Sequence, residues 1–167
     1  MHLTETLSLP VPAAAAGAMY ADPVYAEVRR ETMGARTASA RVDGDAAGAF
    51  TTTTELTMPT DRVPDMMRRF VGQTVTVRET QRWQAPGPDG ARDGEISFEI
   101  VGAPASMTGR TRLAPAGADA STITIDGELE AKVPLLGRRI EQAAIPYVSQ
   151  VLGLESTSAA AYARSRR

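Results

Sequence analysis

The feature that most constrains the fold is a change in the period of the apolar residues. From Gly34 to about residue 133, apolar side chains recur at alternate positions, as in strands with one buried face. From Gly137 onward they recur every three or four residues, as in an amphipathic helix. Both apolar surfaces are buried if the helix lies on the sheet. The pattern therefore predicts an α+β domain with a long C-terminal helix across a curved antiparallel sheet.

Seven strands are expected in that sheet. The first, residues 2–9, ends at prolines, and it is followed by two short helices at 12–21 and 23–33, the second stopped by Gly34. Turn-forming residues then separate six alternating runs, which indicates a meander. The predicted runs are 36–43, 48–58, 73–84, 95–101, 106–114 and 121–133.

Composition fits one domain over residues 1–167, with a basic tail at 163–167 that we expect to be frayed. The chain has no cysteine, which excludes disulfides and thiolate metal sites, and its one histidine, His2, cannot form a histidine cluster. We therefore expect no cofactor and no metal. We also expect no disulfide-stapled secreted fold, and a cytoplasmic location fits best.

Charge and hydropathy exclude two further classes of partner. The net charge is −2, and the arginines alternate with acids without forming a basic face, so nucleic acid is not an expected partner. No apolar run approaches the roughly 18 residues of a membrane span, so we expect no transmembrane segment. Arg110 and Arg112 fall on the polar face of their strand, where they can pair with acids of the last strand, Asp126, Glu128 or Glu130.

Four segments carry a resemblance to a known superfamily. They are LPVPAAAAGAMYADPVY near the start, MPTDRVPDMMRRFVG in the middle, QRW at residues 81–83, and KVPLLGRRIE before the helix. With this order of elements, the chain resembles the START-like, helix-grip (SRPBCC) superfamily over its whole length, and within it a bacterial family of unknown function. The resemblance implies a cavity between sheet and long helix, which the superfamily commonly uses for apolar or amphipathic small molecules.

Polar residues on the inner face of the sheet are the informative candidates, because a buried polar group needs a partner or a ligand. Glu79 falls on the same face of its strand as Val75, Val77 and Trp83, yet acids avoid burial, which favours a position at the solvent-exposed rim. The alternative is a ligand-facing group or an acid/base. Tyr147 lies on the apolar stripe of the helix and is interpreted as a core aromatic. The methionine-rich segment after Met58 is either a lid or a packed extension of a hairpin.

These interpretations give a predicted set of cavity-lining residues and no committed catalytic residue. The predicted lining is Thr52, Thr54, Met58, Met66, Met67, Phe70, Glu79, Gln81, Trp83, Phe98, Met107, Thr111, Ala144, Tyr147, Val148 and Val151.

Three functions follow as hypotheses. The leading one is binding or carriage of a hydrophobic or amphipathic small molecule, lipid-like or polyketide-like, without catalysis. The second is a cyclase-like or dehydratase-like enzyme that uses Glu79 or Tyr147 as acid/base. The third is a protein-interaction module that docks through the methionine-rich segment.

Overall fold

A computed structural model describes all of residues 1–167. Along the chain, the elements follow the predicted order, with boundaries shifted by up to three residues for the strands. They are β1 (His2–Leu9), α1 (Ala13–Tyr20), α2 (Val24–Met33), β2 (Thr37–Gly44), β3 (Phe50–Pro59), α3 (Asp65–Val71), β4 (Thr74–Trp83), β5 (Arg92–Ile100), β6 (Ala105–Pro115), β7 (Ser121–Ala131) and α4 (Gly137–Ser165).

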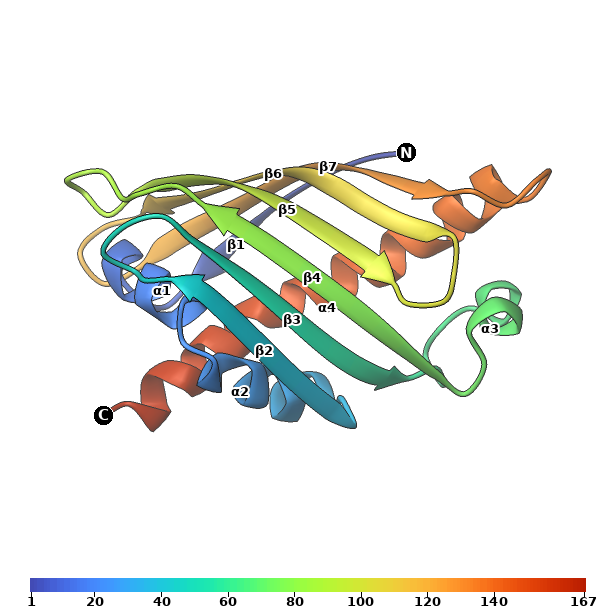
Figure 1. Cartoon of the computed structure of the whole chain (residues 1–167), viewed down its shortest axis with the longest axis horizontal. Helices are drawn as coiled ribbons and strands as arrows, with labels where there is room; N and C mark the ends of the chain where they lie inside the picture. Colours follow the sequence, from blue (N-terminus) through green and yellow to red (C-terminus); the bar gives the residue numbers. More distant parts are fainter.

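The seven strands form one antiparallel sheet in the order β1-β7-β6-β5-β4-β3-β2. The meander from β2 to β7 is thus consecutive in space, and β1 adds to its last strand. Figure 1 shows α4 running across one face of the sheet, with α1 and α2 beside its C-terminal half and α3 near its N-terminal end. The predicted helix-grip arrangement, with the helix laid across the sheet, is confirmed. None of the helices combines the length and apolarity required to cross a membrane.

The two faces of the sheet divide as the alternation predicts. On β7, Ile123, Ile125 and Leu129 are buried against α4, while the residues between them face outward. Arg110 and Arg112 are exposed on the outer face of β6, also as predicted. The partner predicted for Arg112 is wrong, because its guanidinium donates to Asp93 of β5 at 2.6 Å and not to an acid of β7.

Helix α4 carries the predicted apolar stripe, on which Ile140 and Ala144 are buried, and it contains Pro146. The prediction of a frayed tail at 163–167 is wrong, since the helix continues to Ser165. Asp22 holds this end in place: its carboxylate accepts a hydrogen bond from the Tyr162 hydroxyl at 2.6 Å and pairs with the Arg166 guanidinium.

Two glycines face each other where β6 and β7 approach most closely. Gly109 and Gly127 are in direct register, and a Cβ atom on Gly109 would lie 2.3 Å from the carbonyl oxygen of Asp126 and 2.5 Å from the Cα of Gly127. Real Cβ atoms do not come so close to backbone, so any side chain at position 109 forces the strands apart.

We therefore expect Gly109→Ala to lower the free energy of unfolding by about 1–3 kcal/mol, the usual cost of overpacking. The matched control is Gly153→Ala in α4, where a Cβ meets nothing within 4 Å. That change should leave stability equal or raise it by up to about 1 kcal/mol, because alanine is the better helix former. Chemical denaturation measures both, and equal stabilities for the two variants would contradict the close approach of the strands.

Candidate functional site

A cavity of about 150 Å³ lies between the inner face of the sheet and α4. Its wall is largely apolar: 17 of the 22 residues that line it are hydrophobic, so its interior favours uncharged molecules. The structure brings many of the predicted residues together here. Those that line the cavity are Thr54, Met58, Met67, Glu79, Phe98, Met107, Ala144, Tyr147, Val148 and Val151.

A second cavity of about 80 Å³ adjoins the first toward α3. Met67 and Tyr147 line both cavities, so a movement of either side chain changes the opening between the two cavities. Phe70 lines only the second cavity and is 43% exposed, and Met66 lines neither. Helix α3, which has no buried residue, therefore covers this end of the cavities through Met67, Phe70 and Val71.

Four predicted residues are buried but line neither cavity: Thr52, Gln81, Trp83 and Thr111. Gln81 and Trp83 form a hydrogen-bonded row with Glu79 along β4. The Trp83 indole nitrogen donates to Gln81 Oε1 at 2.8 Å, and Gln81 Nε2 donates to Glu79 Oε1 at 2.7 Å. The row therefore leads from the core to the carboxylate at the cavity wall.

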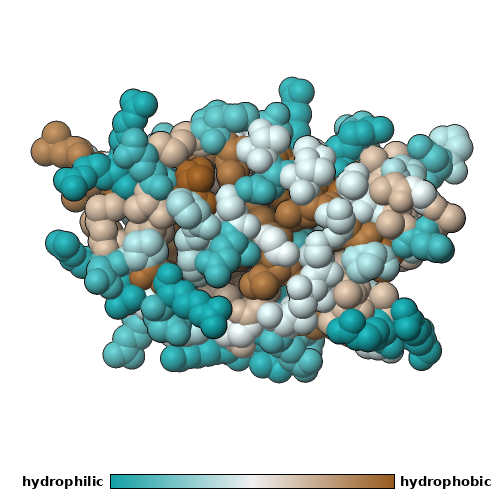
Figure 2. All heavy atoms as spheres, turned by 180° about the vertical axis from the view of Figure 1, so that it is seen from behind, coloured by the Kyte–Doolittle hydropathy of each residue, from teal (hydrophilic) through white to brown (hydrophobic).

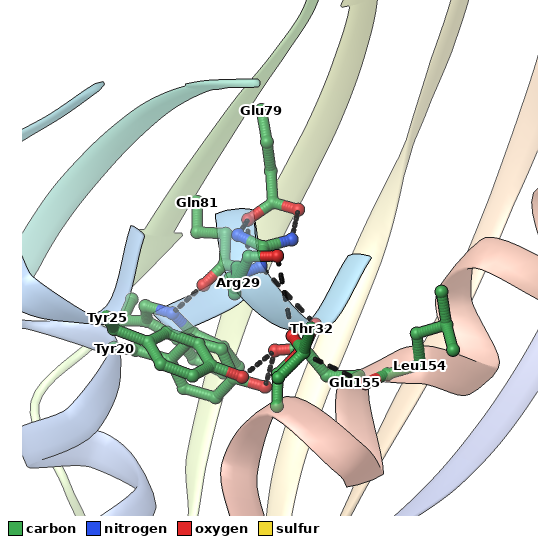
Figure 3. Close-up of polar contacts among 10 residues, drawn as sticks. Tyr20, Tyr25, Arg29, Thr32, Glu79, Gln81, Leu154 and Glu155 are labelled. Atoms are coloured by element: carbon green, nitrogen blue, oxygen red, sulfur yellow. Dashed lines mark hydrogen bonds and ion pairs between the residues drawn. The ribbon is translucent and has the colours of Figure 1, made fainter. Parts of the chain in front are cut away.

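Glu79 is buried, with 6% of its surface exposed, so the rim position favoured by the sequence is wrong. The physical reason is Arg29 of α2, which supplies the counter-charge. Its two terminal nitrogens donate to the two carboxylate oxygens of Glu79 at 3.1 and 2.9 Å (Figure 3). A bidentate pair of this kind is the arrangement in which a carboxylate is most readily buried.

A second carboxylate, Glu155 of α4, lies on the other side of Arg29. Its Oε2 is 3.6 Å from Arg29 Nε, and its Oε1 accepts hydrogen bonds from the hydroxyls of Tyr20 at 3.1 Å and Tyr25 at 2.7 Å (Figure 3). The ion cluster, defined as Arg29, Glu79 and Glu155 with its donors Tyr20, Tyr25 and Gln81, joins both short helices, β4 and α4. Two carboxylates share one guanidinium, and neutral donors bind the Oε1 atom of each carboxylate.

Burial and the neighbouring charges of the ion cluster shift the pKa values of Arg29, Tyr20 and Tyr25. Burial alone would lower the pKa of Arg29, but Glu79 and Glu155 outweigh it and raise that pKa well above its usual value. Burial, reinforced by the charge of Glu155, raises the pKa of Tyr20 and of Tyr25 well above 10. The arginine is therefore a cation and both phenols are hydrogen-bond donors at neutral pH.

Sequence reasoning missed Arg29, Glu155, Tyr20 and Tyr25, although helical periodicity carried a signal for two of them. Arg29 falls between Tyr25 and Met33 at intervals of four, on the buried face of α2. Glu155 falls on the stripe of α4 between Leu152 and Ala159, beyond the point at which the predicted stripe ended. A cation on the buried face of one helix and an acid on the buried face of another indicate an internal ion pair.

Tyr147 lies at the cavity wall and apart from the ion cluster. Its side chain lines both cavities, and partial burial, followed by the charge of Asp61, raises its pKa. No hydrogen bond joins it to Glu79. The two residues named for acid/base chemistry thus line the same cavity without being hydrogen-bonded to each other.

Comparison with protein families gives one match, which spans residues 4–162 and has the description "Protein of unknown function (DUF2505)". The chain belongs to this family. The resemblance to a family of unknown function is thereby confirmed. No curated protein matches in sequence.

Solved structures confirm the fold. The ZhuI aromatase/cyclase from Streptomyces sp. R1128 is similar with a TM-score of 0.60 and 13% identity over 99% of this chain and 94% of its own. Human STARD10 gives 0.61 and 12% identity over 99% of this chain and 65% of its own. Norcoclaurine synthase from Thalictrum flavum gives 0.53 and 14% over 95% and 90%. At these identities the likeness establishes the START-like fold and nothing about activity.

The ion cluster predicts a large effect of Arg29→Met. This change leaves two buried carboxylates without their cation and should lower the free energy of unfolding by about 3–5 kcal/mol. Arg30→Met, at the next position of α2, removes only solvent-accessible ion pairs with Glu27 and Glu31 and should change stability little. Denaturant unfolding of both variants tests this, and similar losses would show that Arg29 is not the cation on which the cluster depends.

The raised tyrosine pKa values predict loss of stability in alkali. A phenol whose pKa is higher in the folded than in the unfolded chain stabilises the fold fully below about pH 10, and this contribution disappears as the pH rises through the folded-state pKa. We expect Tyr20 and Tyr25 to ionise only together with unfolding. Tyrosinate absorbance and circular dichroism, followed in one alkaline titration, should change at the same pH, whereas full ionisation of all tyrosines in a folded protein would contradict the burial.

Proposed function

We propose that the cavity binds a small, neutral, largely apolar molecule. The observation that carries this proposal is the absence of an available charge in its wall. Arg29 and Glu79 pair with each other. The carboxylate of Glu141 lies 3.7 Å from the N-terminal ammonium group and accepts a hydrogen bond from the backbone nitrogen of Ala131 at 3.0 Å. A charged ligand would lose its hydration without gaining a counter-ion, which costs several kcal/mol.

The size of the cavity limits the ligand. An engineered apolar cavity of about 150 Å³ in another protein takes up benzene, so the first cavity suits one aromatic ring or a short branched alkyl group. A molecule of two or three rings, such as N-phenyl-1-naphthylamine, would occupy both cavities, which join once Met67 or Tyr147 moves. Methionine adapts its shape at low cost, which favours Met67 as the side chain that yields. A lipid with long acyl chains would need a larger opening at α3.

Binding is favoured over catalysis by the state of Glu79. An acid/base must be able to exchange a proton with its substrate, and both oxygens of this carboxylate already accept hydrogen bonds from Arg29. Tyr147, with its raised pKa, is suited to donate a hydrogen bond to a carbonyl or hydroxyl of the ligand. Some proteins of this fold are enzymes by name, such as the aromatase/cyclase, but the cyclase-like alternative has no matching acid/base pair in this chain.

Two substitutions in α4 separate an open cavity from a solid core. Ala144 lines the cavity, whereas Ala159 is fully buried in the core and does not. Ala144→Phe should fill the cavity, change the melting temperature little, and abolish binding of the neutral fluorescent probe N-phenyl-1-naphthylamine. Ala159→Phe should overpack the core and lower stability by about 1–3 kcal/mol.

The probe also tests the charge of the ligand. The wild type should bind N-phenyl-1-naphthylamine and discriminate against the anionic anilinonaphthalene sulfonate. A wild type that binds no neutral probe, or an Ala144→Phe protein that binds it as well as the wild type, would remove the support for this site.

A further inference from the structure

The turn between β7 and α4 has an unusual tip. Leu135 has its side chain fully exposed, at 101% of the reference area, and it is the only residue other than glycine with a positive φ, at 66°. Leu136 beside it is 36% exposed. We define the leucine corner as residues 132–139, which contain both leucines and the start of α4.

Leucine at position 135 benefits neither the backbone nor the core of this chain. Residues with a side chain rarely adopt this φ, and asparagine or glycine adopts it at lower cost. The side chain buries no surface against the protein, so it gains no hydrophobic stabilisation in return. Leu135 thus combines an unfavourable backbone conformation with an exposed apolar side chain, and no contact within the protein offsets either cost. This combination indicates a contact with another molecule.

The charges of the leucine corner indicate the chemistry of that contact. Lys132, Arg138 and Arg139 are all exposed, and the stretch from 132 to 139 contains no acid. None of the three makes an ion pair within the chain, whereas Arg68 of α3 pairs with Asp65 at 3.1 Å. The first turn of α4 adds the partial positive charge of a helix N-terminus. The leucine corner therefore has two exposed apolar side chains, flanked in sequence by three cations that form no ion pair within the chain.

Other exposed apolar residues occur at the same end of the molecule. Phe70 at the end of α3 and Val101 in the β5–β6 turn are 43% and 46% exposed. In Figure 1 these turns and the leucine corner lie together at the right, and Figure 2, seen from behind, shows a hydrophobic tip flanked by hydrophilic atoms at its left end. Lys132 and the leucines thus belong to a broader apolar and basic end.

We propose that this end docks on an anionic lipid surface, with Leu135 and Leu136 among the lipids and Lys132, Arg138 and Arg139 at the phosphates. An apolar insertion and a basic cluster are the two signals that together give peripheral membrane binding, and each is weak alone. A second copy of the chain fits this surface less well, because its own Lys132, Arg138 and Arg139 would lie against the same three cations of the first copy. The proposal does not depend on the occupancy of the cavity.

The test is sedimentation of the full chain with vesicles. The protein should bind vesicles of phosphatidylcholine mixed with phosphatidylglycerol, bind pure phosphatidylcholine at least tenfold less, and lose binding as salt rises. The double variant Leu135→Asn, Leu136→Asn should lose at least tenfold in vesicle affinity while melting at or above the wild-type temperature, because asparagine suits the backbone at 135. Val24→Asn, which alters an exposed apolar residue at the other end, is the matched control and should bind like the wild type.

Further outcomes separate this proposal from its rivals. The double variant should still take up N-phenyl-1-naphthylamine, so loss of docking and loss of cavity binding are distinguishable. Binding that ignores lipid charge, or that persists in the double variant, overturns the proposal. A wild type that stays off anionic vesicles but forms a dimer that the double variant cannot form overturns it in favour of a second copy.

Discussion

The Arg29–Glu79 pair is the contact on which the arrangement of this domain depends. A guanidinium on α2 is buried between a carboxylate on β4 and another on α4, so three elements distant in sequence must meet at one point. Burying these charges is costly and is offset only when all three are in place with their donors. A hydrophobic core tolerates sliding of its parts, whereas this cluster defines one position of α2 and α4 on the sheet.

That position creates the cavity. The ion cluster occupies the inner face near α2 with groups too polar to collapse onto the apolar wall. Between the cluster and α3, helix α4 presents side chains such as Ala144 and Val148 that are too small to fill the space. Packing favours closure of such voids, since an apolar void loses contacts along its whole lining. We infer that the void persists because the ion cluster, which joins α2, β4 and α4, fixes the distance between sheet and helix.

The order of the elements and the faces of the strands could be predicted from the sequence, whereas most contacts of the candidate site could not. Strand faces follow from strict alternation, so the inward side chains of β3, β4 and β7 could be named in advance. Glu79 was assigned to the correct face of the sheet. Its burial depends on Arg29, which lies 50 residues away in the sequence, and a local sequence pattern does not reveal such a distant partner. Thr52 and Thr111 were on the correct face and yet outside the cavity, because alternation gives the side of the sheet and not the position along it.

The two ends of the molecule differ in how firmly they are held. At the ion cluster, aromatic rings pack edge to face, as Tyr20 and Tyr25 do at 5.7 Å, and hydrogen bonds link four elements. At the other end, α3 has no buried residue and covers the second cavity with Met67, Phe70 and Val71. Local opening is cheapest where few apolar contacts are lost. Entry and exit of the proposed ligand therefore cost least at the α3 end. The leucine corner, which we propose meets a lipid surface, lies at this same end. An apolar molecule would then pass between cavity and membrane without crossing water.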